Sequence, residues 1–134
     1  MPIDSIMTAN PVTIGPDATL AEARELIEKH QIHHLLVESH KRVVGLVSEV
    51  DILRNISPYA NTPAETARDQ FTLNKKIHQV MRRNPPTITP SDSVKTAAKI
   101  ILEDHITCVP VVDNSGNLVG IVSWKDLLRF AMNR

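Results

Sequence analysis

The chain has 134 residues, of which 42% are hydrophobic and 22% charged, as expected of one compact globular domain or two half-domains that share a core. Its 15 basic and 15 acidic residues balance, which argues against broad nucleic-acid binding because that relies on many Lys and Arg contacts to phosphates. The single cysteine excludes an intramolecular disulfide framework, and we find neither a signal-peptide pattern nor an apolar run long enough to span a bilayer, so we expect a soluble, cytoplasmic protein that binds no membrane.

The first elements along the chain are predicted in the order β-α-β-β-α. Residues 11–14 predict a short extended segment, and Thr19, with a capping-box glutamate three residues later, predicts the start of a helix. Strands are predicted over residues 33–37 and 43–47, separated by a polar turn. Ser48 is predicted to open a closing helix.

Residues 55–79 have no counterpart elsewhere in the chain. Thr62 as N-cap, Pro63 in the first turn and Glu65 as capping-box partner predict a helix from Pro63 to about Leu73. This insert is therefore expected to be structured. The sequence leaves open whether it covers a binding cleft or contributes to a dimer contact.

The elements after the insert repeat the earlier order. Thr87 and Ile88 predict an extended segment, and Ser93 is the predicted N-cap of a helix with apolar residues at helical spacing. Strands are predicted over residues 109–112 and 118–122, and Ser123 is predicted to open the last helix.

Two stretches of sequence recur in similar form. Residues 7–14 return as residues 81–88, an offset of 74, and residues 45–54 return as residues 120–129, an offset of 75. Each copy is expected to be one supersecondary unit that cannot bury its apolar face alone. Two copies therefore predict a pseudo-twofold module with a pair of equivalent clefts.

The predicted fold class is α+β, built from tandem β-α-β-β-α repeats that pack as a pseudo-twofold pair. We place the first copy at residues 1–54, the partly helical insert or linker at residues 55–79, and the second copy at residues 80–134.

Each copy closes on the pattern Gly-apolar-apolar-Ser-x-x-Asp, which holds Ser48 and Asp51 in the first copy and Ser123 and Asp126 in the second. Each serine lies where a strand ends and a helix begins, so unpaired backbone N–H groups and the serine hydroxyl favour an anion such as phosphate. Each aspartate lies one turn later and is placed to accept hydrogen bonds from a ribose diol. The alternative interpretation of Ser-x-x-Asp is a capping box that only stabilises the helix.

The glycine that stands three residues before each serine, Gly45 or Gly120, is a position where backbone can approach a ligand closely.

The doubled pattern resembles the cystathionine-β-synthase (CBS) domain pair, or Bateman module, across both copies. The resemblance implies a disc-like module that binds an adenosine-containing ligand (AMP, ADP or ATP) in one or both clefts. It implies that the serine and aspartate contact phosphate and ribose, that two chains dimerise through their helical faces, and that occupancy is signalled to a protein target that the sequence does not name. No cofactor is required in this interpretation.

Two further stretches are expected to complete the clefts. One is the Thr-Ile pair of each copy, which we expect to lie beside the base. The other is the opening of the first strand of each hairpin, which resembles the family's base-contacting segment. Lys125 is an additional phosphate-directed cation. Further candidates, for each of which solvated surface charge is the favoured interpretation, are Arg54, Arg82, Arg83 and Arg129. The predicted ligand-binding residues are Thr13, Ile14, His34, Leu35, Ser48, Asp51, Thr87, Ile88, Cys108, Val109, Pro110, Ser123, Lys125 and Asp126.

The copies diverge where a base would bind. Pro110 of the second copy, which gives the commoner family form, corresponds to Leu36 of the first copy, and Cys108 corresponds to His34. We therefore expect unequal affinities, with the second motif occupied first.

Other functions are less favoured by the sequence. The histidines between residues 30 and 40 do not share a helical face, so no metal site is predicted. No nucleophile stands beside a general base, so no enzyme is predicted. Two alternatives stay open: a ligand-free structural or interaction module working through Trp124 and the insert, or a binder of S-adenosylmethionine or NAD(H).

Overall fold

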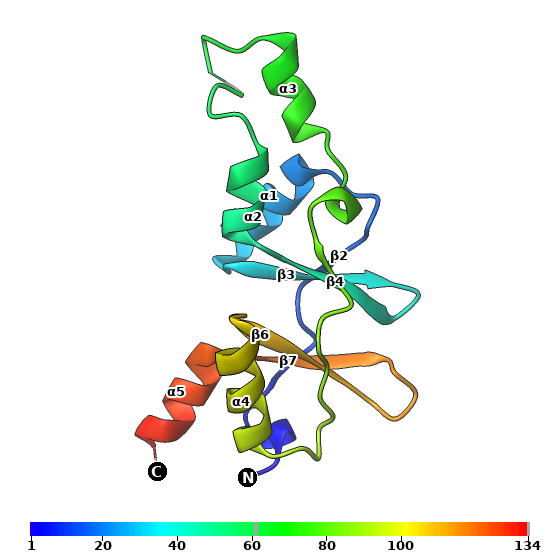
Figure 1. The fold of residues 1–134 in the computed structure, drawn as a ribbon, viewed down its shortest axis with the longest axis vertical. Helices are drawn as coiled ribbons and strands as arrows, with labels where there is room; N and C mark the ends of the chain where they lie inside the picture. The colour runs from blue at the N-terminus through cyan, green and yellow to red at the C-terminus, as the bar shows by residue number, and fades with distance from the viewer. Residues whose placement is uncertain (61, 134) are drawn as a thin grey trace. The chain divides into compact units, whose positions relative to one another are not determined.

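The computed structural model describes residues 1–60 and 62–133 (Figure 1). The predicted β-α-β-β-α run is present in the first copy, and the second copy repeats it except that Ile88 forms only an isolated parallel bridge with Val111 where the first strand was predicted; the predicted α+β fold class is confirmed. With η for a 3-10 helix, the elements are η1 (Ile3–Ser5), β1 (Thr8–Ala9), β2 (Thr13–Ile14), α1 (Leu20–His30), β3 (His34–Ser39), β4 (Arg42–Ser48), α2 (Glu49–Asn55), α3 (Ala67–Leu73), η2 (Ile77–Gln79), β5 (Arg82–Arg83), α4 (Val94–Asp104), β6 (Cys108–Val112), β7 (Leu118–Ser123) and α5 (Trp124–Met132).

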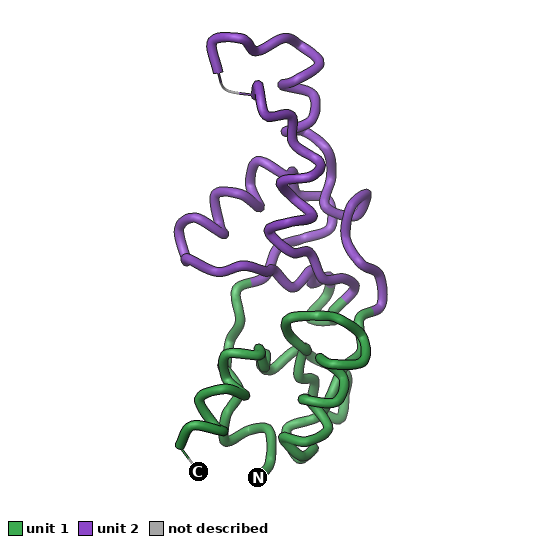
Figure 2. The backbone as a smooth tube through the Cα atoms, turned by 60° about the vertical axis from the view of Figure 1, so that its left-hand side comes forward, with its two compact units in different colours: residues 1–12, 40–43, 85–134 green, residues 13–39, 44–84 purple. Residues whose placement is uncertain are grey.

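The chain forms two compact units that do not follow the order of the sequence (Figure 2). Unit 1 contains Met1–Val12, His40–Val43 and Pro85–Arg134, and unit 2 contains Thr13–Ser39 and Val44–Asn84. One sheet has the strand order β1-β7-β6, and the other has the order β2-β3-β4-β5.

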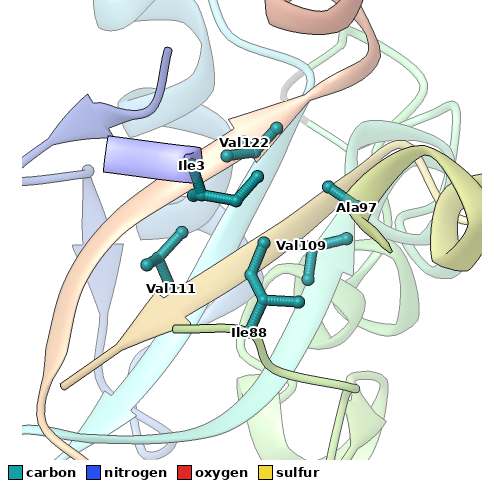
Figure 3. Close-up of a cluster of buried hydrophobic side chains, with 6 residues drawn as sticks. All are labelled: Ile3, Ile88, Ala97, Val109, Val111 and Val122. Carbon is teal, nitrogen blue, oxygen red and sulfur yellow. The ribbon is translucent and has the colours of Figure 1, made fainter. Parts of the chain in front are cut away.

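The core of unit 1 is aliphatic and draws on segments far apart in the sequence. Burying each such Val or Ile side chain stabilises the fold by roughly 1.5–3 kcal/mol. Figure 3 shows the side chains of this cluster converging between η1, α4 and the β6–β7 hairpin. The cluster consists of Ile3, Ile88, Ala97, Val109, Val111 and Val122.

The helices α1 of unit 2 and α4 of unit 1 follow the predicted local rules. Leu20, Ala23 and Ile27 bury one face of α1 at helical spacing. The backbone N–H of Glu22 donates to the Thr19 hydroxyl at 3.2 Å, which confirms the predicted N-cap. Ser93 caps α4 in the same way, accepting from the N–H of Thr96 at 3.2 Å.

The two copies exchange the segments that precede their extended strands. We call residues 1–12 and 75–84 the lead-in segments. Residues 75–79, which the sequence analysis assigned to the insert, are therefore the counterpart of residues 1–5, as the matching helices η1 and η2 show. The first lead-in contributes β1, which pairs antiparallel with β7 of the second copy, and the second contributes β5, which pairs antiparallel with β4 of the first copy. Apart from His40–Val43 of the first copy, which belong to unit 1, each compact unit is therefore the body of one copy together with the lead-in of the other. These two-residue strands were missed because two residues carry no periodicity.

Backbone hydrogen bonds anchor both lead-in segments at equivalent positions. The N–H of Ile3 donates to the carbonyl of Asp92 at 2.8 Å, and the N–H of Ile77 donates to the carbonyl of Ala18 at 2.9 Å. Ile3 and Ile77 are both fully buried, so each anchor also fills the core of the unit that receives it.

The glycine of each closing pattern accommodates the lead-in segment of the other copy. A Cβ atom on Gly120 would lie 2.7 Å from Sδ of Met7, and one on Gly45 would collide with the side chain of Met81. β1 pairs with β7 at Gly120, and β5 pairs with β4 at Gly45. The backbone that closely approaches each glycine is therefore that of the exchanged strand.

The insert is helical, but its helix begins later than predicted. Thr66 is the N-cap of α3 and forms a complete capping box with Asp69. The predicted start at Thr62 is wrong: its hydroxyl donates to the carbonyl of Tyr59 at 2.5 Å and so closes a turn. Thr66 and Asp69, four residues further along the same pattern, form both reciprocal hydrogen bonds of a capping box and so start the helix there.

None of the described helices is long and apolar enough to cross a membrane.

Candidate functional site

Both Ser-x-x-Asp motifs lie at strand-to-helix junctions, as predicted. Ser48 ends β4 and caps α2, and Ser123 ends β7 and caps α5. Each junction is pinned to the neighbouring strand, because the N–H of Glu49 donates to the carbonyl of His33 at 2.8 Å and that of Trp124 donates to the carbonyl of Thr107 at 3.0 Å. The two motifs therefore share one backbone arrangement.

The first motif forms a capping box. The N–H of Ser48 donates to Oδ2 of Asp51 at 3.2 Å, and the N–H of Asp51 donates to the Ser48 hydroxyl oxygen at 3.1 Å. Within the described residues, Oδ1 of Asp51 and the hydroxyl hydrogen of Ser48 are left without a protein partner. The motif therefore retains one carboxylate acceptor and one hydroxyl donor for another group.

The second motif forms the same box with more of its polar groups engaged. The N–H of Ser123 donates to Oδ2 of Asp126 at 2.8 Å, and the Ser123 hydroxyl also reaches that oxygen at 3.2 Å. Oδ1 of Asp126 accepts from the guanidinium of Arg129 at 3.3 Å, and the Asp126 side chain is only 8% exposed. Arg129 is an exposed side chain, as interpreted from the sequence, and is also the ion-pair partner of Asp126.

The capping interpretation is thus realised in both copies, and it reduces the number of free backbone donors. Of the first three N–H groups of α2, those of Glu49 and Asp51 are engaged, which leaves that of Val50. The expectation that the first turn is unpaired was wrong for two of three groups, because the strand carbonyl and the serine hydroxyl reach them. An anion at the first motif would therefore depend on the side chains and one backbone N–H.

The structure brings several predicted residues of the second copy together on neighbouring strands. Cys108 is the register partner of Ser123 across β6 and β7, and the N–H of Ile88 donates to the carbonyl of Pro110 at 3.1 Å. In unit 2, Thr13 pairs with Leu36 in the equivalent parallel arrangement.

Most of the predicted base-contacting side chains are interior. Leu35, Cys108 and Val109 are fully buried, and Ile14, Ile88 and Pro110 are buried as well. Contact from these positions to a ligand would therefore come from backbone atoms. Thr13 and His34 are partly exposed and Thr87 is exposed, so their side chains stay accessible.

Two further predicted site residues, Cys108 and Lys125, differ in their surroundings. Burial raises the pKa of the Cys108 thiol to about 12, so it packs as a small apolar residue. The ammonium of Lys125 lies 5.9 Å from the centre of the Trp124 ring, on an exposed part of α5. Within residues 1–60 and 62–133, no group of three or more His, Cys, Asp and Glu side chains is placed to hold a metal ion.

A groove in unit 1 borders the second motif. Its volume is about 660 Å³, and Asp126, Arg129 and Phe130 of α5 line it opposite Met1 and Ile6 of the lead-in segment. The repeat-equivalent groove in unit 2 is smaller, about 380 Å³, and is lined in part by Phe71 of α3 and by Asn74, which ends that helix. The insert thus borders the groove of unit 2 and has no counterpart in unit 1.

Comparison with known proteins identifies the family. The CBS domain model matches residues 3–58 and 75–133. A CBS domain-containing protein of Dictyostelium discoideum is 30% identical over 128 residues, which is 94% of this chain and 88% of the relative. The chain covers only 23% of a homoserine O-acetyltransferase from Methanocorpusculum labreanum, to which it is 29% identical.

Two similar solved structures contain adenosine compounds. The structure of CBSX2 in complex with AMP has a TM-score of 0.80 at 25% identity and covers 98% of this chain and 96% of that chain. The CBS domain pair of protein MJ0100, in complex with 5′-methylthioadenosine and S-adenosyl-L-methionine, has a TM-score of 0.80 at 28% identity and covers 100% and 98%. The chain belongs to the CBS domain family and consists, over its matched residues, of a tandem CBS domain pair, or Bateman module.

Proposed function

We propose that the chain is a regulatory module that binds an adenosine-containing ligand, with AMP, ADP or ATP preferred, at one or both Ser-x-x-Asp motifs. Each aspartate would accept hydrogen bonds from the ribose hydroxyls, and each serine would donate to a phosphate oxygen. The Thr-Ile pairs and the openings of β3 and β6 would contact the base, and Lys125 would add positive charge at the second motif.

The observation that carries this proposal is the first motif. It combines an uncommitted carboxylate oxygen on Asp51 with an uncommitted hydroxyl on Ser48, one helical turn apart. A diol and an anion on one molecule match these two groups, and a nucleotide provides both. The AMP complex of the similar protein CBSX2 supports the same class of ligand.

We further propose that two chains associate through α4 and α5 and pass occupancy to a protein target. These helices expose a band of large apolar side chains and enclose a groove of about 440 Å³. The band contains Leu102, Trp124, Leu128 and Met132, which are 74%, 47%, 51% and 76% exposed. Apolar patches of this kind mark association surfaces. Binding would act by favouring one of two conformations, and only a difference in affinity between them produces a shift.

A second ligand class has a specific observation in its favour. The MJ0100 domain pair binds S-adenosyl-L-methionine and is 28% identical to this chain. The ribose-binding aspartate would serve that ligand equally, and NAD(H) as well. The remaining alternative is a structural module that binds no small molecule.

Thermal unfolding with AMP, ATP, S-adenosylmethionine and NADH distinguishes these functions. A ligand at 100 times its dissociation constant should stabilise the protein by about 2.7 kcal/mol, which raises Tm by several degrees. Stabilisation by AMP or ATP supports the nucleotide sensor, and stabilisation only by S-adenosylmethionine or NADH supports the alternative ligands. No shift with any of the four compounds would contradict the proposal and leave the structural module.

A further inference from the structure

The two motifs differ in what the second carboxylate oxygen contacts. Oδ1 of Asp126 accepts from the Arg129 guanidinium at 3.3 Å, and only 8% of the Asp126 side chain is exposed. Arg54 stands at the equivalent position of the first copy, three residues after Asp51, yet within the described residues it forms no ion pair with Asp51. Asp51 is also more exposed than Asp126.

The surroundings of Arg129 provide a reason for this difference. Arg129 lies in the groove of unit 1 together with Asp126 and the apolar side chains of Met1, Ile6 and Phe130, along which its aliphatic stem can extend. In unit 2, the equivalent groove is lined by Asn55 and Val80 among others, but by neither Asp51 nor Arg54. Asn55 replaces Phe130 and uses its amide to donate to the carbonyl of Asp51 at 2.7 Å.

The serine hydroxyl is also more fully hydrogen-bonded in the second motif than in the first. The Ser123 hydroxyl reaches Oδ2 of Asp126 at 3.2 Å, whereas the Ser48 hydroxyl only accepts, from the N–H of Asp51. A ligand at the second motif would therefore displace two existing side-chain interactions, and a ligand at the first motif would displace neither.

We infer that Arg129 sets the order in which the two motifs fill: by pairing with Asp126 it closes the second motif, so an adenosine-containing ligand binds first at Asp51. This inference rests on the proposed nucleotide binding. It reverses the order expected from Pro110 and Lys125 in the sequence, because the pairing of Asp126 is visible only in three dimensions. Arg129 acts through Asp126 and is therefore a positioning residue.

The expected size of the effect follows from the exposure of the pair. The Arg129 side chain is 72% exposed, so solvent screens its attraction for Asp126. Solvent-exposed ion pairs change an equilibrium constant by about two- to five-fold. Removing the guanidinium should therefore tighten the second site by about two- to five-fold, and high salt should reduce the difference between the sites.

Site-specific binding can be measured because the chain has one tryptophan, and Trp124 lies within the second motif. Trp124 fluorescence reports AMP at the second motif, and isothermal titration calorimetry reports total AMP binding. The substitutions are Asp51→Asn and Asp126→Asn, which keep an acceptor for the capping N–H, and Arg129→Gln. Arg129→Lys retains the charge, and Arg54→Gln is the matched control in the first copy.

Three results are expected. Asp51→Asn removes the tighter AMP binding and Asp126→Asn leaves it. Arg129→Gln tightens the Trp124-reported constant, while Arg129→Lys and Arg54→Gln stay near wild type. The gain in Arg129→Gln disappears at high salt, which a purely structural effect of the substitution would not show.

Other results would overturn the inference. Loss of the tighter binding in Asp126→Asn, or an unchanged Trp124-reported constant in Arg129→Gln, refutes the role of Arg129 while leaving nucleotide binding intact. Absence of AMP binding in wild type and in every variant refutes the AMP site and this inference with it.

Discussion

Replacing Gly120 by alanine tests the exchange of lead-in segments between the copies. The added Cβ would lie 2.7 Å from Sδ and 3.2 Å from Cγ of Met7, and 3.1 Å from the carbonyl oxygen of Thr8. The methionine side chain can rotate, but the carbonyl belongs to β1, which is paired with β7 at this residue and its neighbour. Forcing an extra methyl group into such a site costs about 1–3 kcal/mol.

The assay is urea unfolding at fixed protein concentration, followed by circular dichroism, with Gly15→Ala as the matched control. No atom lies within 4 Å of a Cβ on Gly15, and its φ is not positive, so this substitution should change the free energy of unfolding by less than about 0.5 kcal/mol. Combining Gly120→Ala with Met7→Ala should recover part of the loss, because the methyl group then occupies space left by the thioether. Their costs should therefore be less than additive.

Equal stability of Gly120→Ala and Gly15→Ala would refute the packing of the first lead-in segment against β7. Full additivity of Gly120→Ala and Met7→Ala would show that the glycine serves another purpose, such as the approach of a ligand.

Three other predictions concern separate parts of the chain. Cys108 should resist a thiol reagent at pH 8 in the folded protein and react on unfolding, because burial raises its pKa to about 12; rapid reaction of the native protein would contradict its burial. A hydrogen bond from the Ser57 hydroxyl is the main cause of the lowered pKa of Asp69, so Ser57→Ala should raise that pKa toward 3.8 in a carboxyl NMR titration. Because the folded pKa is depressed, the stabilisation from Asp69 is present above its unfolded pKa and is lost as pH falls through the lower folded value; an unchanged pKa in Ser57→Ala would contradict the assignment. Leu128→Glu should convert the proposed dimer to monomer in sedimentation velocity, and a monomeric wild type would refute the α4–α5 interface.

Local sequence rules predicted the helices and their caps. Ser48, Ser93 and Ser123 each cap the helix assigned to them, because an N-cap hydrogen bond spans only three residues and depends on residue types visible in the sequence. The same rule misplaced the start of α3, where Thr62 and Thr66 are both plausible caps and only the partner contacts decide between them.

Long-range pairing was beyond these rules. Nothing in a two-residue strand identifies its partner, so the exchange of β1 and β5 between the copies was not predicted. A signal was nevertheless present: Met7 and Gly120 recur as Met81 and Gly45, and a bulky thioether repeated alongside a residue without a side chain is consistent with close packing between them.

The sequence correctly placed Ser48 and Ser123 at strand-to-helix junctions, but it did not show how the motif side chains pair. The sequence places Arg54 and Arg129 identically, and only the groove beside Phe130 distinguishes the arginine that pairs from the one that does not. The proposed preference between the two sites rests on this pairing and therefore required the structure.

Calorimetric titration of AMP into wild type and into the Asp51→Asn, Asp126→Asn double variant tests the proposed function most directly. Both asparagines can still accept the capping N–H of Ser48 and Ser123, so the double variant should unfold like wild type. We predict saturable binding to wild type that the double variant loses. Equally tight AMP binding by the double variant, or no binding of AMP, ATP, S-adenosylmethionine or NADH by wild type, would contradict the proposed function.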